Sequence, residues 1–222
     1  MCHHAETRHA IFNEFGVANS VIRISNNIVV KYGYSVKRSE AATQQYAAQK
    51  LNPRGIVRVP HVYRYFQDYS CIRPAFPRLM CYLFMEYIPG PTLEQEGPDL
   101  SQDKTVNAIY ERLAKAVSEL NSVAIHENNG IPGPINSGGK PLDGYLFGDD
   151  GTKVAISSVD DLNNWLNKRL KIIKKAIDLH PYPFTLCHLD FSRRNIKLTS
   201  DYNRNNSSNY SICLLDWGFA GF

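Results

Sequence analysis

A short segment near the C-terminal end of the sequence carries residues that could do chemistry together. His188, Asp190 and Asn195 have the spacing H-x-D-x-x-x-x-N, and Asp216 follows within the apolar run 210–217. A carboxylate on a loop can accept the proton of an attacking hydroxyl, and an amide further along can bind a divalent cation in the same cleft. Asp216 would bridge that cation to phosphate groups. The pattern predicts a phosphoryl-transfer site; the alternative is an ordinary polar loop with His188 satisfied by a backbone group.

The elements that must position these residues begin with a predicted hairpin and a helix. Residues 20–32 contain two β-branched runs separated by Asn26-Asn27, a pair that tolerates the positive φ of a tight turn. The stretch 37–51 is rich in Ala and Gln, and it predicts a helix that Ser39 caps and that the following Asn-Pro pair ends. We therefore expect an antiparallel hairpin beside one helix.

Later segments add strands and then amphipathic helices. Strands are expected over 56–66 and 79–88, and the second is apolar enough to be buried on both faces. After the Pro-Gly-Pro turn at 89–91 the apolar period changes to three and four residues, which predicts helices over 101–121 and 161–179. The fold class is therefore α+β, with a sheet and one helix before the turn and a mainly helical part after it.

Composition narrows the class of protein further. The 222 residues are 43% hydrophobic and 21% charged, which is enough apolar material for one large domain or two lobes, predicted here as 1–88 and 89–222. No apolar run approaches the ~20 residues that cross a bilayer, so we expect a soluble cytoplasmic protein. A net charge of +4 is too even for a dedicated nucleic-acid binder. The five cysteines show no C-x-x-C spacing, which favours reduced thiols.

With these motifs, the chain resembles the aminoglycoside phosphotransferase and choline kinase branch of the protein-kinase-like superfamily over about residues 12–222. The resemblance implies a two-lobed kinase-like fold that binds ATP and Mg²⁺ between its lobes and transfers the γ-phosphoryl group to a hydroxyl of a small molecule. It implies that Asp190 is the catalytic base, that Asn195 and Asp216 bind magnesium, and that His188 supports the catalytic loop. The alternative is a kinase-like nucleotide-binding or scaffold protein without turnover.

The same resemblance assigns four residues before the turn. Lys31 would hold the α and β phosphates, unless it is an edge-strand lysine that faces water. Glu40 would orient Lys31, although a glutamate at a helix start is also favoured by the macrodipole. Glu86 and Ile88 would meet adenine through a backbone carbonyl and a backbone amide. The alternative for this pair is a buried strand that simply ends at a Pro-Gly turn.

Some features are less determined by the pattern. Arg193 and Arg194 could approach the transferred phosphoryl group or an anionic substrate, or they could form a solvated pair or a salt bridge. The glycine-rich stretch 130–151 is expected near the mouth of the cleft, with a surface loop as the alternative. Only Gly16 stands where a glycine-rich phosphate loop would precede the hairpin.

The resemblance also predicts a truncated chain. The family continues into further helices at the point where this sequence ends, just after Asp216. The residues that choose the acceptor are expected to lie largely in those helices, so the identity of the substrate does not follow from the sequence. The oligomeric state is not predicted either.

Overall fold

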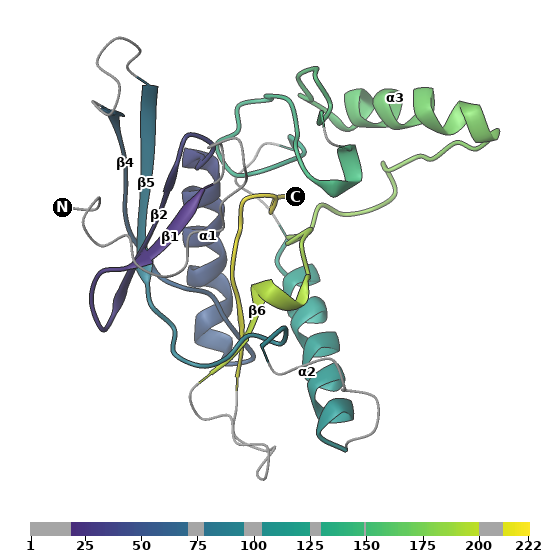
Figure 1. Ribbon diagram of the computed structural model, residues 1–222. Coiled ribbons are helices and arrows are strands. Elements are labelled where there is room, and N and C mark those ends of the chain that lie inside the picture. The colour runs from purple at the N-terminus through teal and green to yellow at the C-terminus, as the bar shows by residue number, and fades with distance from the viewer. Residues whose placement is uncertain (1–18, 71–77, 96–103, 125–129, 149, 200–210) are drawn as a thin grey trace.

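A computed structural model describes residues 19–70, 78–95, 104–124, 130–148, 150–199 and 211–222 (Figure 1). In chain order its elements are β1 (Ser20–Arg23), β2 (Ile28–Gly33), α1 (Arg38–Leu51), β3 (Val57–Arg58), β4 (Val62–Ser70), β5 (Arg78–Glu86), α2 (Lys104–Asn121), α3 (Val159–Leu170), β6 (Ile196–Leu198) and β7 (Ile212–Leu214). Short 3₁₀ helices lie at Asn52–Arg54, Tyr145–Phe147, Lys171–Ile173 and Arg193–Asn195. The mixture of an antiparallel sheet with helices confirms the predicted α+β class.

The predicted hairpin forms one side of a four-stranded antiparallel sheet, whose order is β1-β2-β5-β4. Its turn differs from the prediction, because four residues connect the strands and neither Asn26 nor Asn27 has a positive φ. The side chain of Arg23 donates to the carbonyl groups of Ser25 and Asn26, which stabilises this longer turn without a left-handed residue. Lys31 therefore lies in β2, between two neighbouring strands, and not at the edge of the sheet.

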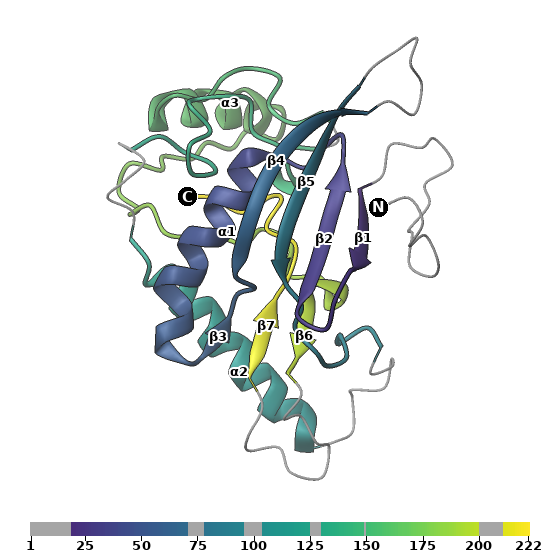
Figure 2. The ribbon, with the colours of Figure 1, turned by 90° about the vertical axis from the view of Figure 1, so that its left-hand side faces the viewer.

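Helix α1 covers one face of this sheet (Figure 2). Its N-cap is Lys37 without a side-chain hydrogen bond, so the prediction that Ser39 caps the helix was wrong; Ser39 lies inside the first turn. The helix ends before the Asn-Pro pair, as predicted, and the Asn52 side chain then clamps Val59. Asn52 Nδ2 donates to the Val59 carbonyl at 2.9 Å, and the Val59 amide donates to Asn52 Oδ1 at 2.7 Å.

The two faces of β5 differ in burial. Cys81 and Leu83 are buried in an apolar cluster beneath α1. Tyr82 and Phe84, on the opposite face, are only partly buried and stack on Phe66, with ring centroids 4.9 and 5.6 Å away. The prediction of burial on both faces was therefore wrong for one face, which an aromatic cluster covers in place of a second layer.

The strand predicted over 56–66 is split between two sheets. β4 belongs to the four-stranded sheet, whereas β3 belongs to a second sheet. There β3 pairs in parallel with β7, and β7 pairs antiparallel with β6. The main hydrophobic core joins α1 and β3 to α2, β6 and β7. Its members include Tyr46, Ala47, Leu51, Val57, Ile109, Leu120, Leu186, Leu198, Leu214 and Trp217. The N-terminal and C-terminal parts of the chain thus share one core, and the division at residue 88 stays a prediction.

The second predicted helix of the C-terminal part is shorter than expected. α3 ends at Leu170, and a single 3₁₀ turn follows in which Ile172 is 84% exposed. Lys174 adopts a left-handed φ of 54°, which stops the helix. The chain then runs back along α3, where the Asn167 side chain pairs with both backbone groups of Ile177. The periodic apolar pattern therefore continued beyond the helix it predicted.

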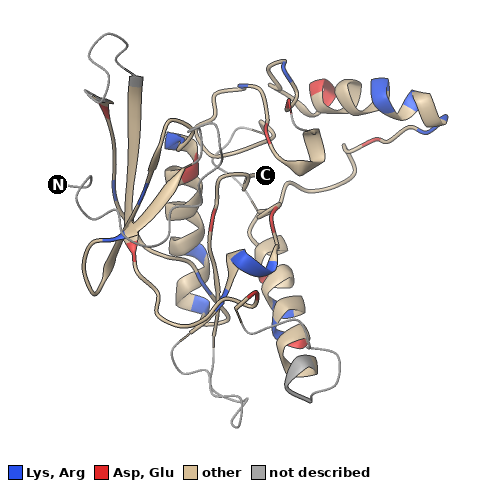
Figure 3. Ribbon diagram, viewed as in Figure 1, with Lys and Arg blue, Asp and Glu red and all other residues tan. Residues whose placement is uncertain are grey.

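Two further observations concern charge and membrane association. Basic and acidic residues are both present along α2 and α3, in keeping with the nearly even charge of the chain (Figure 3). Within the described ranges, no helix has the length and apolar character that spanning a bilayer would require.

Candidate functional site

Strands β6 and β7 hold the two segments of the H-x-D-x-x-x-x-N and Asp216 motifs side by side. β6 begins directly after Asn195, and β7 ends just before Leu215 and Asp216. The amide of Leu215 donates to the Asn195 carbonyl at 2.8 Å, which extends the pairing by one step. The sequence prediction missed β6. This strand has only three residues, Ile196–Leu198, which is too short to leave a clear alternating pattern.

His188 fastens the loop to the segment before Asp216. The ring is 1% exposed and packs edge-on against Trp217, with centroids 4.8 Å apart. The Asp190 amide donates to Nδ1 at 3.4 Å, so Nε2 carries the hydrogen and donates to the Leu215 carbonyl at 2.9 Å. Burial lowers the pKa of His188, which favours this neutral form. The arrangement suits the predicted role of His188 in ordering the loop.

Asp190 and Asn195 form a buried pair. Asn195 Nδ2 donates to Asp190 Oδ2 at 2.8 Å and to the Asp190 carbonyl at 3.3 Å, and both residues are less than 8% exposed. Within the described part of the chain, no hydrogen bond uses the other carboxylate oxygen of Asp190 or the amide oxygen of Asn195. One oxygen of Asp190 is therefore fixed while the other stays available to a hydroxyl, and Asn195 keeps the hard oxygen ligand that Mg²⁺ prefers.

Lys31 connects the sheet to both α1 and the C-terminal segment. Its Nζ lies 2.6 Å from Glu40 Oε1 and 2.8 Å from Asp216 Oδ1. Lys31 is 7% exposed and Glu40 is 3% exposed, whereas the Asp216 side chain is about half exposed. The alternative of a lysine facing water is therefore wrong. The lysine–glutamate pair is built into the interior, and Asp216 is its partner on the solvent side.

The charges of this triad determine its pKa shifts. Burial by itself lowers the pKa of Lys31, but Glu40 and Asp216 more than offset this, so the pKa lies above its usual value. Burial raises the pKa of Glu40, because the attraction of Lys31 does not fully compensate. For Asp216 the effect of burial is outweighed by Lys31 and by the Gly218 amide, so its pKa is lowered. Asp216 therefore remains a carboxylate that can bind a cation.

The backbone at Asp216 is held in an uncommon conformation. Asp216 has a φ of 58°, and Leu189, between His188 and Asp190, has a φ of 62°. Non-glycine residues in the left-handed region cost free energy and are concentrated at functional sites. A Cβ at Gly218 would lie 3.2 Å from Asp216 Oδ1, so a larger residue there would crowd this carboxylate.

One cavity of about 340 Å³ gathers the predicted cofactor residues of both parts of the chain. Its lining includes Lys31, Glu40, Glu86, Ile88, Asn195 and Asp216. At the end of β5 the Glu86 side chain pairs with Arg58, and the Glu86 amide donates to the His61 carbonyl at 2.8 Å. Within the described residues, no hydrogen bond is found for the amide of Ile88, which leaves it able to donate to a ligand.

The two arginines differ in their surroundings. Arg193 donates to the Leu93 carbonyl at 2.9 Å, which ties the loop to the segment after β5. Arg194 lines the same 340 Å³ cavity, and its Nη2 lies 3.4 Å from Asp190 Oδ2. Gly16, the one glycine before the hairpin, lies outside the described residues. Spacing alone did not separate the two arginines, because adjacent residues of a 3₁₀ turn point in different directions.

The chain is similar to known proteins over most of its length. The family model described as "Phosphotransferase enzyme family" matches residues 16–222. A solved structure, the GDP and kanamycin complex of APH(2")-IIia, matches with 18% sequence identity and a TM-score of 0.47, covering 96% of this chain and 67% of that one. No curated protein gives a significant match. Because the family model spans nearly the whole sequence, the chain belongs to the phosphotransferase enzyme family.

Proposed function

We propose that this family member transfers the γ-phosphoryl group of ATP to a hydroxyl of a small molecule. The observation that carries the proposal is the convergence of Lys31, Glu40 and Asp216, within 2.8 Å contacts, in the cavity that Asn195 and the end of β5 also line. A fixed positive charge, two side chains whose oxygen atoms could bind a metal, and a backbone amide without a hydrogen bond among the described residues lie around one space. A buried lysine held by two carboxylates suits the binding of phosphate groups.

Each residue would act mainly by position. Bound Mg-ATP would supply the phosphoryl group with part of its charge neutralised by the metal. Asn195 and Asp216 would hold that metal, and Lys31 would fix the neighbouring phosphates. Asp190, with Oδ2 fixed by Asn195, would use Oδ1 to orient the acceptor hydroxyl and to receive its proton. The acceptor oxygen would bond to the γ-phosphorus as the bond from that phosphorus to the bridging oxygen breaks, and ADP would leave with that oxygen. The Glu86 carbonyl and the Ile88 amide would bind the adenine edge.

Other parts of the proposal rest on composition and family. A small-molecule acceptor is proposed because of the family to which the chain belongs. A cytoplasmic location without nucleic-acid or membrane partners is proposed because the charge is nearly even and the sequence contains no long apolar run.

Nucleotide binding and transfer are tested separately. Thermal unfolding is recorded with Mg-ATP, with Mg-GTP and with ATP in EDTA, and a magnesium-dependent rise in Tm is expected. Transfer is then followed by release of ADP over a panel of alcohols, sugars and aminoglycosides. A rise in Tm without formation of ADP, either with any of the acceptors or with water alone, would favour a binding protein without turnover. No rise in Tm at millimolar Mg-ATP would contradict the proposed site.

A further inference from the structure

A short loop reaches all three segments of the site. We call Leu142–Gly148 the strap. Asp143 forms an ion pair with Lys37, the N-cap residue of α1. Tyr145 Oη accepts a hydrogen bond from Arg194 Nη2 at 3.0 Å, and the Tyr145 ring packs edge-on against Phe219 with centroids 5.5 Å apart. The strap therefore contacts the helix that carries Glu40, the catalytic loop and the segment after Asp216.

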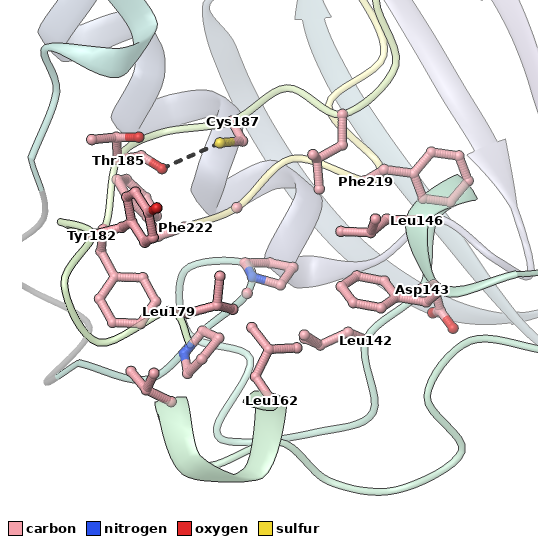
Figure 4. Close-up of a pocket in the computed structure, with 18 of the residues that line it drawn as sticks. Leu142, Asp143, Leu146, Leu162, Leu179, Tyr182, Thr185, Cys187, Phe219 and Phe222 are labelled. Atoms are coloured by element: carbon pink, nitrogen blue, oxygen red, sulfur yellow. Dashed lines mark hydrogen bonds between the residues drawn. The ribbon is translucent and has the colours of Figure 1, made fainter. Parts of the chain in front are cut away.

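The base of the strap is fixed to α3. The Leu142 amide donates to Thr152 Oγ1 at 2.9 Å, and the Thr152 amide donates back to the Leu142 carbonyl at 2.8 Å. Trp165 Nε1 donates to the Thr152 carbonyl, and the Phe147 ring packs against Trp165. Leu142 and Leu146 face an apolar cavity of about 250 Å³, with Phe219 on the same wall (Figure 4). The ends of the strap are thus fixed to Thr152 and Trp165, and the side chains of Asp143 and Tyr145 contact residues of the site.

Glycines determine the path of the strap. Gly144, between Asp143 and Tyr145, has φ 129° and ψ 167°, a region open essentially to glycine alone. A Cβ at Gly151 would lie 2.5 Å from the Leu142 carbonyl oxygen and 2.6 Å from Asp143 Oδ1. The loop can therefore place an acidic and an aromatic side chain on different targets within three residues.

Arg194 links the strap to the catalytic carboxylate. Its Nη2 lies 3.0 Å from Tyr145 Oη and 3.4 Å from Asp190 Oδ2. Asp190 Oδ2 thus accepts hydrogen bonds from both Asn195 and Arg194. Tyr145 in turn restrains the guanidinium group of Arg194. The Arg194 side chain is about half exposed, so its attraction to Asp190 alone would be weak. The hydrogen bond from the same nitrogen to Tyr145 Oη restrains the guanidinium group further.

We propose that Tyr145 is a positioning residue for Asp190, acting through Arg194. The inference rests on the proposed function, in which Asp190 aligns the acceptor hydroxyl. Tyr145 would keep Asp190 Oδ2 engaged, so that Oδ1 points to the acceptor. The simpler alternative is a surface hydrogen bond that only holds the loop in place.

The test compares Tyr145→Phe with Tyr110→Phe, which removes a hydroxyl from a 56% exposed tyrosine on α2. Hydrogen exchange of the amides of residues 190–195 should rise about three- to tenfold in Tyr145→Phe and stay unchanged in the control. In turnover, kcat should fall by a similar factor while the KM for nucleotide changes less than twofold. In an Arg194→Ala background, Tyr145→Phe should cause no further loss.

The outcomes separate this inference from the proposed function. Unchanged exchange in the catalytic loop of Tyr145→Phe would overturn the inference whether or not the protein is active. Additive losses in the double variant, or an equal loss in Tyr110→Phe, would also overturn it. If the wild-type protein binds no nucleotide and transfers no phosphoryl group, the proposed function fails, and the exchange data alone then decide whether Tyr145 controls the loop around Asp190.

Discussion

Lys31 Nζ lies 2.8 Å from Asp216 Oδ1, although 185 positions separate the two residues in the chain. Glu40 Oε1 accepts a hydrogen bond from the same nitrogen, so Lys31 contacts two carboxylates. This local excess of negative charge suits a site that receives a metal ion together with phosphates, because Asp216 can turn to the cation while Glu40 keeps hold of the lysine. In the proposed function, the Lys31–Glu40 pair would stay in place when the metal and phosphates bind, and Asp216 would exchange its contact with Lys31 for the metal.

Removing the lysine should destabilise the fold. In Lys31→Met the 3% exposed carboxylate of Glu40 loses its partner, and we expect a loss of about 3–5 kcal/mol in the free energy of unfolding. Adding Glu40→Gln should restore part of that loss. The measurement is urea denaturation, with Lys37→Met as the control, since its exposed ion pair should contribute at most about 1 kcal/mol. Equal stability of Lys31→Met and the wild type would show that the pair is not buried.

Substitution of Asp190 and substitution of Asp216 should have different effects. Asp190→Asn should lower turnover by about 10²- to 10⁴-fold and leave magnesium-dependent nucleotide binding nearly intact, because in the proposed function Asp190 acts on the acceptor hydroxyl and not on the nucleotide. Asp216→Asn should abolish the magnesium dependence of binding. Calorimetric titration with ATP, with and without Mg²⁺, distinguishes the two. The assignment of the base is refuted if Asp190→Asn keeps wild-type ADP release.

Stability should depend on pH through His188. Its pKa in the folded state is lowered by burial, so below about pH 6.5 the unfolded chain binds a proton that the folded chain does not. Stability should therefore fall as the pH drops from 7 to 5.5, and His188→Gln should reduce this slope. His180, whose pKa Asp178 raises, has the opposite sign, and His180→Gln serves as the control. Asp216, with a lowered pKa, adds to the loss only at more acidic pH. An unchanged slope in His188→Gln would contradict the buried neutral imidazole.

Gly90 should be among the glycines least tolerant of substitution. A Cβ there would lie 1.8 Å from the Leu198 carbonyl oxygen, in a backbone with φ 114°. Gly90→Ala must therefore displace β6 or the turn, and we expect a loss of more than about 3 kcal/mol in the free energy of unfolding. Gly55→Ala is the matched control, because its φ is 73° but its Cβ would meet no atom, and only about 1–2 kcal/mol should be lost. Chemical denaturation of the two variants gives the comparison.

The sequence indicated which candidate residues lie together more closely than it indicated the elements around them, and the roles of those residues stay predictions. His188, Asp190 and Asn195 are close in the chain, so their spacing fixes their geometry, and the position of Lys31 and Glu40 follows from a strand and the next helix. The parallel pairing of β3 with β7 depends on contacts between distant segments, which no local pattern encodes. The link from Tyr145 to Arg194 was missed for the same reason. The sequence offered only one signal for this link, which was the glycine enrichment of residues 130–151. That enrichment predicted that the stretch containing Tyr145 lies near the mouth of the cleft.

The end of α3 shows another limit. Apolar periodicity continued to Ile177, but the left-handed Lys174 turned the chain, because Asn167 offers its side chain to the returning backbone. An asparagine that replaces helical hydrogen bonds gives no periodic signal. A residue of positive φ other than glycine or asparagine is also hard to foresee from its type.

The parallel pairing of β3 with β7 has a consequence for dissecting this protein. Val57 and Arg58 complete a sheet whose other strands come from the last third of the sequence, and α1 completes the same apolar interior. A polypeptide cut between β5 and α2 would yield two pieces, each with an unsatisfied strand edge beside bare apolar side chains. Such pieces should aggregate when produced separately and reassemble when produced together, which makes this position suitable for a split reporter and unsuitable for isolating a lobe.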